Sequence, residues 1–224
     1  MDAMPQVPLG QSNLFLNPDR RCPCVLLLDT SYSMDGDKID QLNLGLAAFQ
    51  RAISTDLVAL KRVEIAVVTF GGGVTVAQPF TTVDRLSMPR LTAEGDTPMG
   101  EAILKGLDLL ADRKRDYQAA GVPFFRPWVW VFSDGASTDD LSRARTAVKK
   151  AEANSSLSFF SVGVDNADMR ELSSLSARPA LLLKGVDFPK MFEWLSHSLK
   201  SVSSSVPGSN VPLAPVHGWA AVPG

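Results

Sequence analysis

The stretch Val25-Leu-Leu-Leu-Asp-Thr-Ser-Tyr-Ser33 decides the fold that we expect for this chain. Four consecutive branched aliphatic residues lead directly into Asp29, and hydroxyl groups follow at Ser31 and Ser33. A short apolar run of this kind is typical of a strand buried on both faces, at the centre of a parallel sheet. Ligands of open α/β sheets bind just beyond the carboxyl ends of such strands. Because a carboxylate and two hydroxyls are hard oxygen ligands, the stretch also marks a candidate Mg²⁺ site.

Strand and helix patterns alternate along most of the remaining chain. Runs rich in β-branched and aromatic residues predict further strands at 63–70, 74–80, 128–132, 157–164 and 180–183. Apolar residues at spacings of three and four predict helices at 39–53, 99–110, 137–153, 169–175 and 188–202. A residue pattern at 137–140 resembles a capping box and opens the third of these helices, whereas 113–122 is expected to be a charged connection.

This alternation predicts an α/β fold with a doubly wound, mostly parallel central sheet and helices on both faces. Three glycines at 71–73 join two of the strands in a hairpin, which predicts one antiparallel edge strand. We expect an N-terminal arm at 1–20, one domain at 21–204 and a tail rich in Pro and Gly at 205–224, extended or only loosely packed. Leu213 and Trp219 are its only large anchors.

Composition narrows the class of protein. The 224 residues are 45% hydrophobic and 21% charged, which suits one globular domain with tails. A formal net charge of −2 gives no basic surface for nucleic acid or an anionic membrane. Neither a signal peptide at 1–20 nor a membrane span is recognisable, so a cytoplasmic protein is expected.

Two cysteines precede the decisive strand, in Arg21-Cys-Pro-Cys-Val25. Cys22 and Cys24 share a face of an extended chain and supply half a zinc site at most. His197 and His217 lie far along the sequence and cannot be assigned as the other half. We interpret the two cysteines as small apolar residues that lead into the strand.

Two later segments add oxygen ligands to the candidate site. Asp134 follows the strand at 128–132, and Thr97 stands before Pro98 at the start of a predicted helix, where it is also a plausible cap. Taken singly, Asp29 and Asp134 have an alternative role as helix caps. Ser31 and Ser33 equally have one as turn residues.

Together, these residues resemble the von Willebrand factor A family. Its metal-ion-dependent adhesion site (MIDAS) combines Asp-x-Ser-x-Ser after the first strand, a Thr in a later loop and an Asp after a later strand. Here the matching residues are Asp29, Ser31, Ser33, Thr97 and Asp134, and the resemblance spans about 22–204. It implies a fold and a metal site of that kind.

A closer resemblance is to the bacterial TerY-like group, encoded beside tellurium-resistance genes. It is carried by Cys-Pro-Cys-Val-Leu-Leu-Leu-Asp-Thr-Ser at 22–31 and by Gly218-Trp219. The resemblance implies a role in stress signalling, with a protein phosphatase and a kinase-like protein as partners.

The family pattern also implies how the ion is held. Ser31 and Ser33 bind it directly, Thr97 does so in the ligand-competent state, and Asp29 and Asp134 act mostly through water. Mg²⁺ is the expected ion, with Mn²⁺ or Ca²⁺ as alternatives. Neutral hydroxyls leave the ion electrophilic, so that an Asp or Glu of a partner protein completes its shell. Where the family commonly has a small residue between the two serines, this chain has Tyr32. This difference bears on access of the partner's carboxylate to the ion more than on binding of the metal itself.

An enzyme and a metal-independent scaffold are the alternatives. Phosphatases of the haloacid-dehalogenase type need a second Asp where this chain has Ser31, and a Lys whose role here is unsupported at Lys149 or Lys150. Ser-His-Asp catalysis lacks a suitably placed histidine. A scaffold would bind partners through its sheet, its helices or the tail with Trp219. We therefore expect a non-enzymatic interaction module without catalytic residues.

Overall fold

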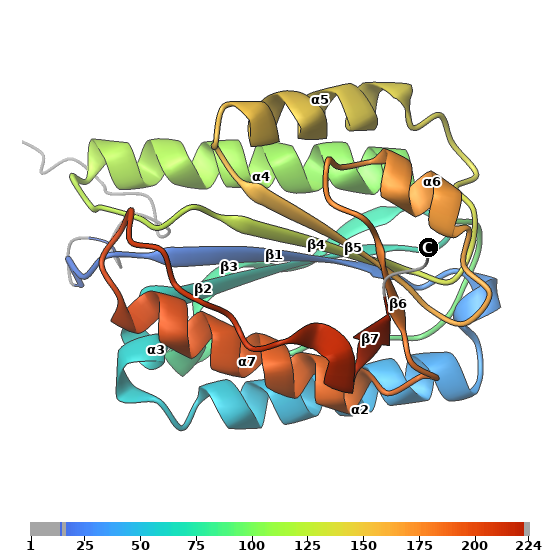
Figure 1. The fold of residues 1–224 in the computed structure, drawn as a ribbon, viewed down its shortest axis with the longest axis horizontal. Helices are drawn as coiled ribbons and strands as arrows, with labels where there is room; N and C mark the ends of the chain where they lie inside the picture. Colours follow the sequence, from blue (N-terminus) through green and yellow to red (C-terminus); the bar gives the residue numbers. More distant parts are fainter. Residues whose placement is uncertain (1–13, 15–16, 222–224) are drawn as a thin grey trace, which may run out of the picture.

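A seven-stranded sheet in the order β3-β2-β1-β4-β5-β6-β7 forms the centre of the computed structural model, which describes Leu14 and residues 17–221 (Figure 1). The strands are β1 (Cys22–Asp29), β2 (Val63–Phe70), β3 (Val74–Thr82), β4 (Trp128–Ser133), β5 (Ser158–Gly163), β6 (Leu181–Leu183) and β7 (Ala220–Ala221). β1 is buried along its whole length and lies between β2 and β4 in parallel pairing. The predicted central strand is confirmed.

The two edges of the sheet are antiparallel. β3 pairs with β2 as the glycine hairpin predicted, and β7 pairs with β6 at the opposite edge. The prediction of a mostly parallel, doubly wound sheet is confirmed, and the second antiparallel edge is an addition to it. β7 has two residues within a segment rich in proline, so its sequence carries no strand pattern.

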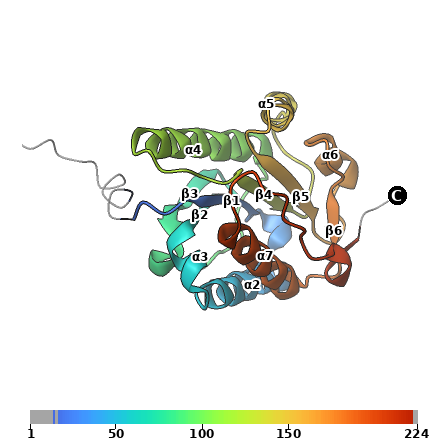
Figure 2. The same ribbon diagram turned by 60° about the vertical axis from the view of Figure 1, so that its left-hand side comes forward.

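Helices cover both faces of the sheet (Figures 1 and 2). α4 (Met99–Ala119), α5 (Ser142–Ala153) and α6 (Met169–Ser174) lie on one face, and α2 (Asp37–Ile53), α3 (Leu57–Arg62) and α7 (Phe188–Ser204) lie on the other. Among the described residues, no helix is both long enough and apolar enough to cross a membrane.

Alternate side chains of β1 belong to two separate cores. Val25 and Leu27 pack with α4 and α5, whereas Leu26 and Leu28 pack with α2 and α7. Because a strand sends successive side chains to opposite faces, an unbroken apolar run is what this central position requires.

Three local differences from the sequence-based expectation have physical causes. α4 continues through residues 113–119, because the charged and aromatic side chains there face a buried carboxylate. α3 was not expected, and its first turn is capped by Asp56, which accepts hydrogen bonds from two backbone amides. α5 begins at Ser142, because residues 137–140 form a loop that contacts α4 instead.

The tail is held more firmly than we expected. Trp219 is buried, and its ring centroid lies 5.4 Å from that of Trp194 on α7. The Trp194 indole donates a hydrogen bond to the carbonyl of Ala214 at 2.8 Å. The expectation of a loosely packed tail is therefore wrong for this part of it. The domain limits at 21–204 stay a prediction, and most of the expected arm at 1–20 lies outside the described residues.

A buried ionic cluster closes the amino-terminal end of the sheet. Glu64 of β2 accepts hydrogen bonds from Arg21 (3.0 Å), from Arg113 (2.7 Å to each carboxylate oxygen) and from the Tyr117 hydroxyl (2.5 Å). Arg21 also donates to the carbonyls of Asn17 and Asp19. Burial, helped by the negative charge of Glu64, raises the pKa of Tyr117, so its hydroxyl keeps the proton that it donates.

Replacing Glu64 tests this cluster. We expect Glu64→Gln to lower the free energy of unfolding by about 3 kcal/mol or more, because Arg21 and Arg113 lose the buried carboxylate that both bind, although Arg113 keeps its ion pair with Asp116 at 3.4 Å. Urea denaturation measures the effect. Glu193→Gln, on the exposed surface of α7, is the matched control and should change stability by less than about 0.5 kcal/mol. Equal effects of the two substitutions would show that the cluster is not a source of stability.

Candidate metal centre

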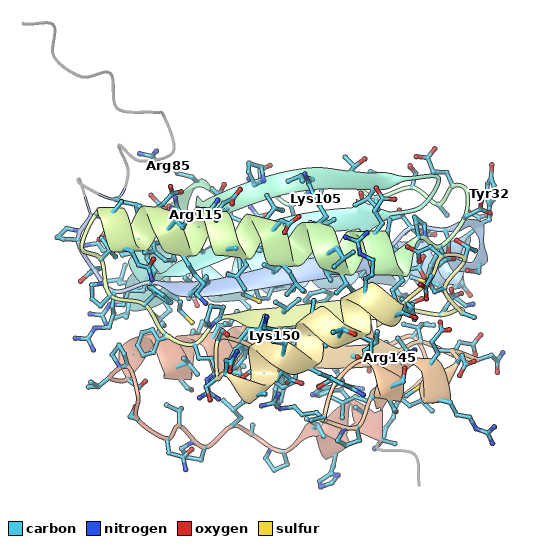
Figure 3. The ribbon with its side chains drawn as sticks, turned by 90° about the horizontal axis from the view of Figure 1, so that it is seen from above. Tyr32, Arg85, Lys105, Arg115, Arg145 and Lys150 are labelled. Carbon is cyan, nitrogen blue, oxygen red and sulfur yellow. The ribbon has the colours of Figure 1, made fainter. Side chains whose placement is uncertain are left out.

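The carboxyl ends of β1 and β4 lie side by side at one end of the sheet. The two strands pair in parallel up to Leu28 and Phe132, so Asp29 and the residues after β4 emerge side by side. Tyr32, which is labelled in Figure 3, marks this end of the molecule. The ordinary geometry of a parallel sheet therefore brings together residues that are about a hundred positions apart.

The carboxylate of Asp29 is wholly buried and engaged on both oxygens. Its Oδ1 accepts a hydrogen bond from the backbone N–H of Ser31 (2.8 Å), and its Oδ2 accepts one from the Ser133 hydroxyl (2.5 Å). Burial raises the pKa of Asp29 in spite of these two hydrogen bonds, and the charge of Asp134 adds to the shift. The first contact is an Asx turn, which directs the chain sharply out of β1.

The two serines form a hydrogen-bonded chain that ends on Asp134. Ser33 Oγ donates to Asp134 Oδ1 at 2.6 Å, and Ser31 Oγ lies 2.9 Å from Ser33 Oγ. Because the Ser33 proton is directed at Asp134, Ser31 is the donor in the second contact. Met34 is fully buried and fixes this loop in the core, whereas Tyr32 is 71% exposed.

Lys38 contacts the same group from the first turn of α2. Its Nζ lies 2.5 Å from Asp134 Oδ2, 3.1 Å from the Ser33 carbonyl and 3.5 Å from Asp165 Oδ2. Burial by itself lowers the pKa of Lys38, but the hydrogen bond and charge of Asp134 outweigh it and raise the pKa. Sequence reasoning missed Lys38. Its one distinguishing feature in the sequence, that it is the single basic residue between Arg21 and Arg51, does not point to a site.

Backbone hydrogen bonds hold the loop before Thr97 against the end of β1. Glu94 N–H donates to the Thr30 carbonyl at 2.7 Å, and Tyr32 N–H donates to the Gly95 carbonyl at 3.0 Å. Gly95 has a positive φ of 64°, and a Cβ atom there would lie 2.1 Å from the Cα of Gly72. Only glycine fits at this crossing.

Thr97 is buried in this adjacent loop, and its backbone is bound to Thr138 through two hydrogen bonds, of 3.2 and 3.0 Å. In the described part of the chain, its hydroxyl makes no hydrogen bond to the other four predicted ligands. Thr97 is not the cap that the sequence suggested. Asp139 instead accepts hydrogen bonds from the amides of Gly100 (2.9 Å) and Glu101 (2.8 Å), which are the first orphan donors of α4.

The donor set fits a hard divalent cation. The serine hydroxyls and the carboxylates of Asp29 and Asp134 converge, and the ammonium group of Lys38, itself a cation, contacts Asp134. Within residues 17–221 no three His, Cys, Asp or Glu side chains form a metal cluster, so any ion here depends on hydroxyl ligands. The structure thus brings Asp29, Ser31, Ser33 and Asp134 together with Thr97 in the next loop. Their action as ligands stays a prediction.

The cysteines show no sign of a metal site. Cys22 and Cys24 are free thiols that are buried in one apolar core. Burial raises the pKa of Cys22 to about 12 and also raises that of Cys24, which disfavours the thiolate that metals bind.

A scan against family models matches residues 24–193 to the von Willebrand factor type A domain (VWA). The chain belongs to the von Willebrand factor type A domain family. The matched segment contains all five predicted ligands of the MIDAS. A comparison with curated protein sequences gave no match.

Solved structures show the same VWA fold at low sequence identity. Proximal thread matrix protein 1 from the mussel byssus is 14% identical (TM-score 0.57) over 84% of this chain and 47% of its own. The ArnB paralog VWA2 from Sulfolobus acidocaldarius is 15% identical (TM-score 0.55) over 80% and 45%. The manganese-loaded TRAP protein of Plasmodium vivax is 17% identical (TM-score 0.54) over 71% and 64%. Another structure of the mussel protein has a zinc-occupied MIDAS motif. The chain spans about half the length of the first two proteins.

The buried charge of Asp29 yields a prediction about stability. Since its pKa is raised in the folded protein, Asp29 stabilises the fold most at acidic pH, and this contribution is lost as the pH rises through the folded-state pKa. We expect Asp29→Asn to raise the free energy of unfolding of the metal-free protein at neutral pH, by on the order of 1 kcal/mol.

Thermal and urea unfolding in the presence of a chelator measure this change. Asp108→Asn, on the exposed face of α4, removes the same charge and should have little effect. A loss of stability in Asp29→Asn would mean that its hydrogen bonds outweigh the cost of its burial.

Proposed function

We propose that the chain is a protein-interaction module that binds a divalent metal and, through it, an acidic side chain of a partner protein. The observation that carries the proposal is the hydroxyl–carboxylate chain from Ser31 through Ser33 to Asp134, beside the buried Asp29. The proposed ligands are Asp29, Ser31, Ser33, Thr97 and Asp134, and Mg²⁺ is the proposed ion, with Mn²⁺ or Ca²⁺ as alternatives. The manganese and zinc in related VWA structures support a divalent metal.

The hydrogen bonds support different roles for the carboxylate and the hydroxyl ligands. Both oxygens of Asp29 already accept hydrogen bonds, which favours a role through water over direct coordination. Ser31 and Ser33 are neutral, so they leave most of the ionic charge uncompensated. A bound metal would supply an electrophilic centre, to which a carboxylate from a partner adds as a further ligand.

The same geometry argues against a phosphatase. A nucleophilic carboxylate must reach its substrate, but Asp29 has no exposed surface. Lys149 and Lys150 are exposed on α5, and Figure 3 shows Lys150 far from the end marked by Tyr32. His197 and His217 are also exposed. A scaffold that binds through Trp219 is disfavoured as well, because this side chain is buried against Trp194.

The finer assignment rests on the sequence resemblance to the TerY-like group. This resemblance implies a cytoplasmic bacterial protein that acts in stress or tellurite-resistance signalling, with a protein phosphatase and a kinase-like protein as partners. The Cys22-Pro-Cys24 opening and Gly218-Trp219 support it. Copurification with such a phosphatase is its direct test.

Removing one hydroxyl tests the metal site. We expect Ser31→Ala to weaken Mn²⁺ binding by about 10- to 100-fold, because a ligand is lost while the fold remains. Isothermal titration with MnCl₂ and MgCl₂ measures the affinity, and circular dichroism checks the fold. Ser201→Ala, on the exposed face of α7, is the control and should bind as the wild type does. Unchanged affinity in Ser31→Ala would refute this ligand assignment.

Capture of a partner should depend on the metal. We expect proteins retained by the immobilised chain in Mg²⁺ to be released by excess chelator, and not to be retained by Ser31→Ala. Partners that bind equally well in chelator would contradict the metal bridge, even where metal binding itself is established.

Tyr32 separates metal binding from partner binding. Because its side chain is 71% exposed and makes no hydrogen bond to the serine hydroxyls among the described residues, we expect Tyr32→Ala to leave Mn²⁺ affinity within about twofold of wild type. Its aromatic surface lies where a partner would approach, so retention of that partner should change. A large change in Mn²⁺ affinity would place Tyr32 in the metal site itself.

A further inference from the structure

Lys38 brings a positive charge to the place where the proposed metal acts. Its ammonium group lies 2.5 Å from Asp134 Oδ2 and 3.1 Å from the carbonyl oxygen of Ser33. The Asp134 side chain is 1% exposed and that of Lys38 is 23% exposed, so the contact is largely shielded from water. It is an ion pair in which Coulomb forces are strong.

The metal ion and the Lys38 ammonium group compete for Asp134, so the site cannot bind both as tightly as it would bind either one alone. Asp29 and Asp134 together carry two negative charges, and Lys38 already balances one of them. A divalent ion close to Asp134 would repel an ammonium group on the same carboxylate. Binding of the metal therefore weakens the contact between Lys38 and Asp134 and favours movement of the ammonium group away from it.

Asp165 offers the displaced ammonium a second partner. It follows β5, its Oδ2 is already 3.5 Å from Lys38 Nζ, and its side chain is 48% exposed. A lysine side chain is long and flexible, so it can move toward Asp165 without any shift of α2.

We propose that Lys38 is an internal competitor of the metal and lowers the metal affinity of this site. The ammonium group neutralises Asp134 in the metal-free protein and moves to Asp165 when the ion binds. This inference rests on the proposed function, because it concerns the same metal. It adds a residue outside the five ligands that determines how tightly the ion is held.

The test compares Mn²⁺ affinities by isothermal titration. We expect Lys38→Met to bind Mn²⁺ about tenfold more tightly than wild type, because the competing charge is gone while the stem of the side chain is kept. Lys105→Met, on the exposed face of α4, changes the net charge equally and should bind as wild type does (Figure 3). Equal or weaker binding in Lys38→Met than in wild type would overturn the inference.

Asp165→Asn tests the second position of the ammonium. We expect it to weaken Mn²⁺ binding severalfold in the wild-type background, but to have no effect in Lys38→Met. A similar loss in both backgrounds would mean that Asp165 acts directly on the ion, which would contradict its proposed role as the acceptor of Lys38.

The outcomes separate this inference from the proposed function. Measurable but equal affinity in wild type and Lys38→Met contradicts the inference alone. An absence of Mn²⁺ binding in both proteins contradicts the two together. Partner capture that survives chelation, with tighter metal binding in Lys38→Met, contradicts the metal bridge and supports the inference.

Discussion

The hydrogen bond from the Ser133 hydroxyl to the buried carboxylate of Asp29 joins the ends of the two central strands. It spans the point at which β1 and β4 emerge in parallel, and the other contacts of the candidate centre follow from it. Asp29 also binds the amide of Ser31, and Asp134 follows Ser133 directly and meets Ser33. A carboxylate placed here costs stability, because burial disfavours its charge. Such a cost at the end of a central strand is typical of residues that serve function rather than folding.

Sequence patterns predicted what depends on periodicity and on strand ends. The unbroken apolar run of β1 predicted its central position in the sheet. The rule that ligands bind at the carboxyl ends of parallel strands then predicted that Asp29, Ser31 and Ser33 would meet Asp134. These predictions needed no knowledge of individual side-chain contacts.

What the sequence could not reveal depends on contacts between distant segments. Asp139 caps α4 from a loop some forty positions away, so the local Thr-Pro pattern at 97–98 pointed to the wrong capping residue. Residues 113–119 appeared too polar for a helix at the sheet, because their partner Glu64 lies on β2. Lys38 carried no motif, and β7 is too short to produce a period.

The return of the chain after α7 determines where the described protein ends. β7 lies against β6, which in turn pairs with the last two residues of β5, Val162 and Gly163. Ala221 thus lies near the same end of the sheet as the candidate metal centre, whereas Asn17 and Asp19 bind Arg21 at the opposite end. A fluorophore or affinity tag attached after Ala221 would add its bulk and charge near the surface that a partner must approach. A fusion joined directly before Asn17 would start from that opposite end, which makes this side the better choice for immobilising the protein.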